Sequence, residues 1–132
     1  LKIFHYARFD LGVIKKYLGI MPSNVYCTKI ASKIARTYSD KHGLRELCKE
    51  LLGIEISKQQ QSSYWGAKNL SKNQLKYAAN DVLHLHQIKN ELEIILDKEK
   101  RSHLINKTLN FLPYRVQLDL LGWENIDIFS HS

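Results

Sequence analysis

The amino-acid sequence predicts an α/β domain with a parallel sheet, in which helices make up most of the chain. Two short apolar segments, residues 2–7 and 25–27, are typical of strands, and each is followed by a helical pattern. Beyond residue 40 only helical patterns recur. Because two strands do not form a stable sheet by themselves, we expect the other strands of this sheet to lie upstream of residue 1.

Strand and helix alternate through the first third of the chain. Apolar residues at helical spacing over 11–18 predict a helix that Gly19 ends. After the strand at 25–27, Thr28 is expected to cap a second helix, whose apolar face carries Ile30, Ala31, Ile34 and Ala35.

Helical patterns then continue through the middle of the chain. Leucines over 44–52 predict an amphipathic helix, which a glycine ends, and a polar loop follows over 54–70. Ser71 and Gln74 form a capping-box pair, which predicts a long helix that continues to Leu96.

The last third is also expected to be helical. A charged break at 98–101 separates the long helix from another through 104–109. Pro113 is expected to open one more helix, because proline fits the first helical position, and Gly122 to close it. The tail over 123–132 is expected to be irregular.

Composition indicates the class of partner. The chain has 20 Lys and Arg against 13 Asp and Glu, a net charge of +7, which favours polyanionic partners. The basic residues of the first two helices fit either a track for a phosphate backbone or ordinary solvated faces. No apolar run approaches the roughly 18 residues that span a bilayer, and Cys27 and Cys48 are expected to be buried thiols of a reducing compartment. We therefore expect a cytoplasmic protein with no membrane partner.

The first candidate site is the segment Tyr77-Ala-Ala-Asn-Asp81. Tyr77 and Asp81 lie four residues apart, so the phenol and the carboxylate project from one helical face. The carboxylate could hold a hard cation and the hydroxyl could orient a water molecule. The alternative is a solvated aspartate beside a half-buried tyrosine.

Asp10 is the second candidate, because it stands where the first strand ends and a helix begins. Ligands gather at the carboxyl ends of strands in open α/β sheets. The alternative is that Asp10 is only the N-cap of the helix. The six histidines have no spacing that fits a zinc motif. Tyr64 and Trp65 could stack on nucleic-acid bases or pin their loop to the core.

Taken together, these segments resemble the ribonuclease D family of 3′-5′ exonucleases, in the tyrosine-bearing subclass of the DEDD superfamily. The resemblance implies a ribonuclease H-like exonuclease fold, here lacking its first strands and so dominated by helices. Residues 1–132 would then be the C-terminal two-thirds of a single exonuclease domain. The likeness extends along nearly the whole chain and is carried by residues 2–10, 25–32, 42–53, 58–63, 77–81, 122–123 and 127–129.

The resemblance also implies a mechanism. Asp10 and Asp81 would be ligands of two Mg²⁺ or Mn²⁺ ions, Asp81 on the ion that activates the attacking water, and Tyr77 would orient that water. The substrate would be the 3′ end of RNA or of single-stranded DNA, and the product a 5′-mononucleotide. The expected nucleic-acid contacts are Lys58, Gln61 and Trp65.

Two departures from the family pattern bear on activity. The family places an Asp-x-Glu pair on the first strand, and no strand of this chain carries one. We therefore expect the chain alone to be inactive and poorly folded. Tyr64 stands where relatives usually have Asp, which is not a metal ligand. The alternatives are a non-catalytic nucleic-acid-binding module and a structural domain completed by a partner.

Overall fold

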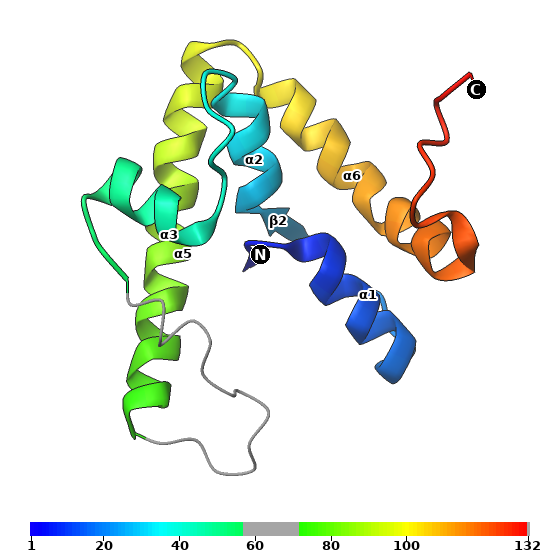
Figure 1. The fold of residues 1–132 in the computed structure, drawn as a ribbon, viewed down its shortest axis with the longest axis horizontal. Coiled ribbons are helices and arrows are strands. Elements are labelled where there is room, and N and C mark those ends of the chain that lie inside the picture. Colours follow the sequence, from blue (N-terminus) through cyan, green and yellow to red (C-terminus); the bar gives the residue numbers. More distant parts are fainter. Residues whose placement is uncertain (57–71, 132) are drawn as a thin grey trace.

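In the computed structural model, helices surround a two-stranded parallel sheet (Figure 1). The structure describes residues 1–56 and 72–131, and side chains for residues 1–56 and 83–131. The elements, in chain order, are β1 (Lys2–Phe4), α1 (Ala7–Leu18), β2 (Val25–Cys27), α2 (Thr28–Ala35), α3 (Leu44–Leu47), η1 (Cys48–Leu52), α5 (Lys72–Lys98), α6 (Ser102–Leu118) and η2 (Asp119–Trp123).

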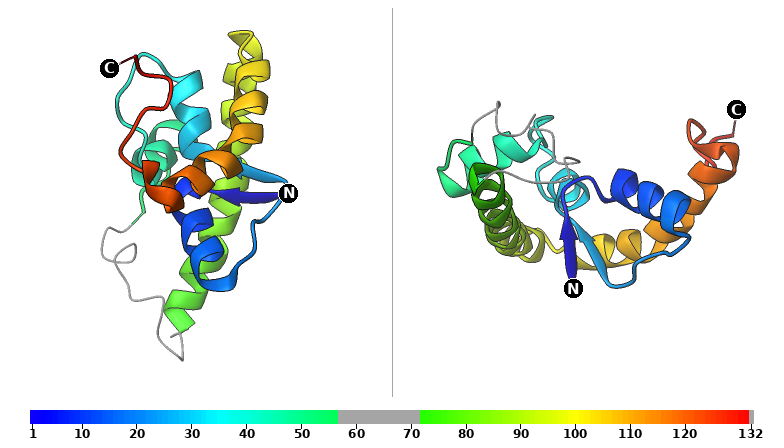
Figure 2. Two further views of the ribbon diagram at one scale, coloured as in Figure 1. Left: turned by 90° about the vertical axis from the view of Figure 1, so that its right-hand side faces the viewer. Right: turned by 90° about the horizontal axis from the view of Figure 1, so that it is seen from below.

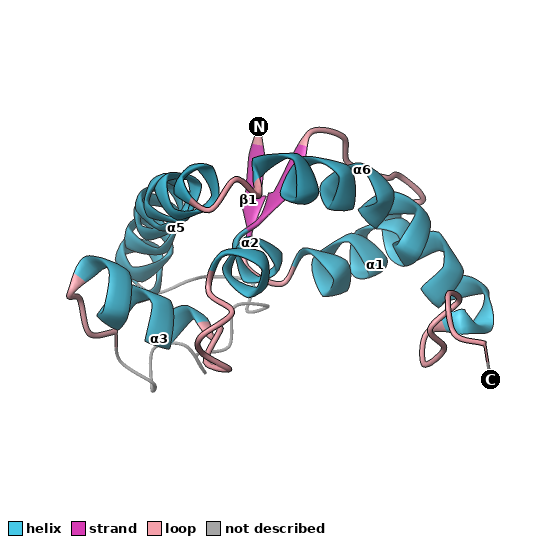
Figure 3. Ribbon diagram, turned by 90° about the horizontal axis from the view of Figure 1, so that it is seen from above, coloured by secondary structure: helices cyan, strands magenta, loops and turns pink. Residues whose placement is uncertain are grey.

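The sheet divides the molecule into two sides, because the side chains of a strand alternate between its faces. β1 and β2 pair in register, with Ile3 opposite Tyr26 and Phe4 opposite Cys27. Ile3 and Tyr26 pack on the side of α2 and α5, whereas Phe4 and Cys27 pack on the side of α1 and α6. Figures 2 and 3 show the sheet between these two groups of helices. The expected α/β class is confirmed, with a small parallel sheet and mostly helices.

The side formed by α2 and α5 holds the larger apolar core. Leu92 is fully buried in the last third of α5, and α2 packs against α5. The buried residues of this cluster are Tyr26, Ala31, Ala35, Leu47, Cys48, Ile56, Ile88, Leu92, Leu96 and Ile105.

Buried polar contacts add to this side. Arg36 follows α2 and is only 1% exposed. Its guanidinium donates to the Ser32 hydroxyl at 3.2 Å and to the Lys41 carbonyl at 2.9 Å, and it pairs with Glu50. Arg36 therefore neither lines a track for a phosphate backbone nor lies on a solvated face. Its charge ties the segment after α2 to η1.

The side formed by α1 and α6 holds a smaller core. Leu11 of α1 and Val116 of α6 are fully buried there, and the rest of the cluster is Ala7, Cys27 and Leu112. Cys27 and Cys48 are both buried, and they lie in different clusters.

Three expected boundaries are wrong. Pro113 does not open a helix but lies inside α6, and packing of its buried neighbours Leu112 and Val116 offsets the hydrogen bond that proline cannot donate. Thr28 is the first residue of α2 and not its cap. β1 ends at Phe4 rather than at residue 7, because α1 begins already at Ala7.

Several other boundaries are confirmed. The helix over 44–52 forms as α3 followed by a π-turn, η1, and ends at Gly53 with φ 67°, a value that favours glycine. The charged break separates α5 from α6. The proposed cap at Ser71 lies outside the described residues. In the described part of the chain, no helix combines the length and apolarity that a membrane crossing requires.

Candidate active site

Asp10 lies in the first turn of α1, just beyond the carboxyl end of β1. The N-cap of α1 is Tyr6, so the interpretation of Asp10 as an N-cap is wrong. The side chain is half-buried, and this burial raises the pKa of its carboxyl group. Among the described residues, the Asp10 carboxylate has neither an ion pair nor a hydrogen bond. A carboxylate that is partly desolvated and without a neutralising partner gains from a bound cation.

Tyr77 and Asp81 both lie in α5, one helical turn apart. Their side chains are outside the described residues. Tyr64 and the three expected nucleic-acid contacts, Lys58, Gln61 and Trp65, are outside them as well. α5 contacts β1, and Ile3 of β1 packs into the cluster that contains Ile88 and Leu92. The convergence of Asp10 and Asp81 on shared cations stays a prediction. Among the described side chains, no group of three potential metal ligands gathers.

Three side-chain hydrogen bonds hold the turn between β1 and α1 in the described part of the chain. The turn has only two residues, His5 and Tyr6. The Thr28 hydroxyl donates to the Phe4 carbonyl at 3.3 Å and shares a hydrogen bond of 2.9 Å with Nδ1 of His5. The Cys27 thiol donates to the His5 carbonyl at 3.4 Å. The turn that leads to Asp10 is therefore fastened to the start of α2.

His5 is neutral near physiological pH. Burial, followed by the positive charge of Lys29, lowers the pKa of His5 from 6.5 to about 4. The Nε2 atom is buried without a hydrogen-bond partner among the described residues. Lys29 itself lies over the ring of Tyr6, with Nζ 4.6 Å from the ring centre, so it covers the other residue of the same turn.

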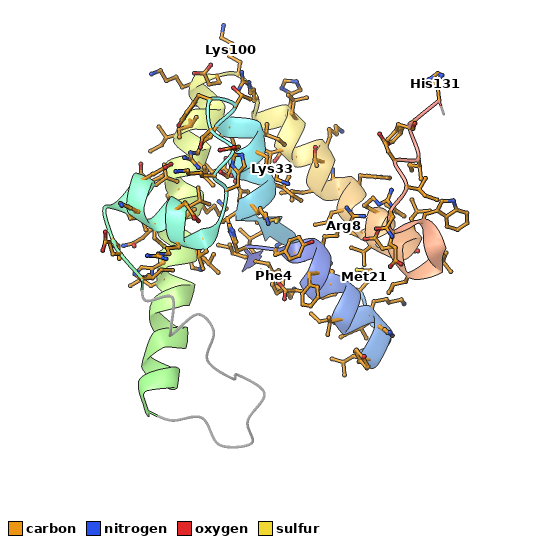
Figure 4. All side chains as sticks on the ribbon, in the orientation of Figure 1. Phe4, Arg8, Met21, Lys33, Lys100 and His131 are labelled. Carbon is orange, nitrogen blue, oxygen red and sulfur yellow. The ribbon has the colours of Figure 1, made fainter. Side chains whose placement is uncertain are left out.

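A second group of contacts fastens α1 to the C-terminal segment. Arg8 of α1 donates two hydrogen bonds of 2.6 Å to the Asp119 carboxylate and one of 3.1 Å to the Glu124 carbonyl. Figure 4 labels Arg8 between α1 and the C-terminal segment. Arg115 of α6 also binds Asp119, at 3.1 Å, and donates to the Ile126 and Trp123 carbonyls. These hydrogen bonds lower the pKa of Asp119 and raise that of Arg8.

Sequence reasoning missed the roles of His5, Thr28, Arg8 and Asp119. His5 and Arg8 lie in the segment that resembles a family motif. Nothing in the sequence pairs His5 with Thr28, more than 20 positions away, or Arg8 with Asp119, more than 100 positions away. The one local signal that we used was the position of Thr28 at the start of a helix. It predicted a helix cap rather than the observed hydrogen bonds to Phe4 and His5.

Comparison with known proteins decides the family. The sequence profile of the 3′-5′ exonuclease family matches residues 1–97. The chain belongs to this family. Its exonuclease resemblance is therefore confirmed, and the described helices and parallel sheet are consistent with a ribonuclease H-like exonuclease fold that is present in part.

Relatives in this family are similar over most of the chain. A ribonuclease D from Gluconacetobacter diazotrophicus is 36% identical over 111 residues, which cover 84% of this chain and 28% of that protein. Brucella melitensis NrnC with bound Mg²⁺ is 53% identical, with a TM-score of 0.88, over 99% of this chain and 63% of that one. NrnC bound to pGG is 54% identical, with a TM-score of 0.87 and the same coverage. The chain thus spans less than two thirds of each relative.

Proposed function

We propose that this chain is part of a metal-dependent 3′-5′ exonuclease that removes 5′-mononucleotides from the 3′ end of RNA, and of single-stranded DNA. The observation that carries the proposal is the half-buried Asp10 at the carboxyl end of β1, in a chain of the 3′-5′ exonuclease family. NrnC relatives with Mg²⁺ and with pGG support both a divalent cation and a short nucleic acid.

The residues fit the cations that we propose, because carboxylate oxygens are the ligands that Mg²⁺ and Mn²⁺ prefer. Asp10 and Asp81 would hold two such ions, together with an Asp-x-Glu pair supplied by a preceding strand. When bound, the ions would supply positive charge to the attacking and leaving oxygens. The Tyr77 hydroxyl would orient the attacking water. Lys58, Gln61 and Trp65 would contact the strand.

The direct test uses the intact protein and an oligonucleotide labelled at its 5′ end, so that stepwise shortening from the 3′ end is visible. Cleavage is expected with Mg²⁺ or Mn²⁺ and absent with chelator. Asp81→Asn and Asp10→Asn should each lower kcat by about 1000-fold or more, because each removes a charge that acts in the transition state. Asp97→Asn is the matched control, since Asp97 is an exposed aspartate of the same helix as Asp81.

The outcomes separate this proposal from its alternatives. A fully active Asp81→Asn variant would contradict its assignment as a metal ligand. Binding of the oligonucleotide without cleavage at any metal concentration would favour a non-catalytic binding module. The same assay on residues 1–132 alone tests the further proposal that this part is inactive without the preceding strands.

We also propose a cytoplasmic location, because the chain has only two cysteines, Cys27 and Cys48, each buried in a different apolar cluster, and buried thiols are usual in a reducing compartment. Cell fractionation followed by immunoblotting tests this, and recovery outside the cytoplasmic fraction would contradict it.

A further inference from the structure

The turn that carries Asp10 allows little freedom between the strand and the helix. β1 ends at Phe4 and α1 begins at Ala7. The backbone N–H groups of Phe9 and Asp10 both donate to the Tyr6 carbonyl, at 3.1 and 3.2 Å. A displacement of the two-residue link is therefore passed directly to Asp10 through the first turn of the helix.

Thr28 is the fixed point against which this link is held. Its side chain is fully buried at the start of α2, and α2 packs along α5 in the larger core. From this position the hydroxyl reaches both the last residue of β1, through the Phe4 carbonyl, and the first residue of the link, through the His5 ring. One hydroxyl group thus joins the strand, the link and the core.

We propose that the hydrogen-bonded pair of His5 and Thr28 positions Asp10 for binding a divalent cation, a role that rests on the proposed function of Asp10. Neither residue touches the cation. Thr28 sets the place of the His5 ring and of the strand end, and the short link transmits this placement to the Asp10 carboxylate. Groups that orient a metal ligand in this way have measurable effects on the affinity for the metal.

The neutral state of His5 suits this role. Burial and Lys29 keep the pKa of His5 near 4, so the ring adds no positive charge beside a cation site at neutral pH. The ionic contact of Arg8 with Asp119 also holds α1, but Arg8 is 40% exposed. The neutral pair is therefore the contact least sensitive to salt, because screening acts mainly on exposed charges.

Binding of Mn²⁺ alone to the intact protein tests the proposal without any nucleic acid, by electron paramagnetic resonance of the free ion. Thr28→Val removes the hydroxyl and keeps the shape of the side chain. We expect it to raise the Kd for Mn²⁺ by about 10-fold, as is typical when a group that orients a metal ligand is lost. Thr28→Ser keeps the hydroxyl and should bind nearly as the natural protein does.

The matched control is Thr108→Val. The Thr108 hydroxyl also donates to a backbone carbonyl, that of Leu104 at 2.7 Å, but the residue is exposed on α6. Its loss should leave Mn²⁺ binding unchanged. An equal rise in Kd for Thr108→Val would overturn the proposal, because the effect would then belong to any lost threonine hydroxyl.

A second variant keeps the test valid where Thr28→Val fails to fold. His5→Phe removes the ring nitrogens and retains a ring of similar size, and it should also weaken Mn²⁺ binding. If the two residues act as one unit, the double variant should bind no more weakly than the weaker single variant, since effects within one unit do not add. Additive effects would show that the two residues do not act as a pair, and lowered thermal stability with unchanged Mn²⁺ affinity would show a merely structural role; either result would overturn the proposal.

Asp10→Asn separates the failure of this proposal from that of the proposed function. Loss of Mn²⁺ affinity in Asp10→Asn, with none in Thr28→Val and His5→Phe, would reject the positioning role alone. Unchanged affinity in Asp10→Asn would reject Asp10 as a metal ligand, and the positioning role with it.

Discussion

The two sides of the sheet are stabilised by different kinds of contact. Among the residues whose side chains the structure describes, the side of α2 and α5 has ten buried apolar residues and the buried guanidinium of Arg36. By the same measure the side of α1 and α6 has five buried residues, with an ionic cluster of Arg8, Arg115 and Asp119. Asp10 lies on the second side. The helix that carries Asp10 therefore has less apolar packing around it than the helices of the first side, and the ionic cluster also holds it.

The largest expected effect lies in the larger core. Leu92→Ala should lower the free energy of unfolding by about 3–4 kcal/mol, because it removes a buried side chain and leaves a cavity. Urea denaturation followed by circular dichroism measures this. Leu83→Ala is the control, since Leu83 of the same helix is 57% exposed and should change stability by less than about 0.5 kcal/mol. Similar losses for both would contradict the assigned core.

The pH dependence of stability should reveal the polar contact of His5 with Thr28 at the turn between β1 and α1. The lowered pKa of His5, about 4 in the folded protein against 6.5 unfolded, means that the unfolded chain takes up the proton first. Stability is therefore full above pH 6.5 and falls as pH drops toward 4, by about 2–3 kcal/mol. Urea midpoints across this range should show the loss, and His5→Gln should remove it. If His5→Gln keeps the full dependence of stability on pH, a group other than His5 causes the loss.

A smaller loss is expected when the ionic cluster is broken. Asp119→Ala leaves Arg8 and Arg115 without their shared partner, and solvent screens the more exposed Arg8. The cost should be about 1–2 kcal/mol, measured by thermal or urea unfolding. Asp97→Asn, which removes an exposed carboxylate of α5, should cost almost nothing.

The stabilisation by the Asp119 carboxylate should also depend on pH, in a more acidic range than that of His5. Hydrogen bonds from Arg8 and Arg115 lower the pKa of Asp119 below 3.8. Its stabilisation is thus present above pH 3.8 and is lost as the pH falls through the lowered value. In Asp119→Asn this acid step should vanish, while the His5 step at higher pH remains. Loss of both steps together would show that the two contacts are not separate.

The smallest effect is expected for a partly exposed ion pair on α5. Lys89 and Glu93 lie 3.7 Å apart at i, i+4, and Glu93→Gln should cost no more than about 0.5 kcal/mol. A denaturation series in low and high salt should show this difference shrinking as salt increases. A cost above that of Asp119→Ala would reverse the ranking of the two ionic contacts.

Much of the fold followed from local patterns. The alternation of strand and helix in the first third, the glycine end of the helix over 44–52 and the break at 98–101 all appear in the structure, because each depends on residues close together in the chain. The placement of Pro113 was wrong for the converse reason. Packing of α6 against α1 overrides the local preference of proline for the first helical position.

The candidate site divides in the same way. Asp10 could be identified from its position at the end of an apolar strand, and its family from the motifs around it. Its neighbours His5 and Arg8 are visible in the sequence, but their partners Thr28 and Asp119 are brought to them only by the fold.

The sequence by itself determined the succession of helices and strands, the family, and Asp10, Tyr77 and Asp81 as candidates, because spacing and local motifs encode these. Only the tertiary structure decided that the Asp10 turn is held by the neutral pair of His5 and Thr28 and that its helix is held by the ionic cluster of Arg8, Arg115 and Asp119. Hydrogen bonds and desolvation depend on distances between residues remote in the chain, and those distances exist only once α1, α2 and α6 have packed around the sheet.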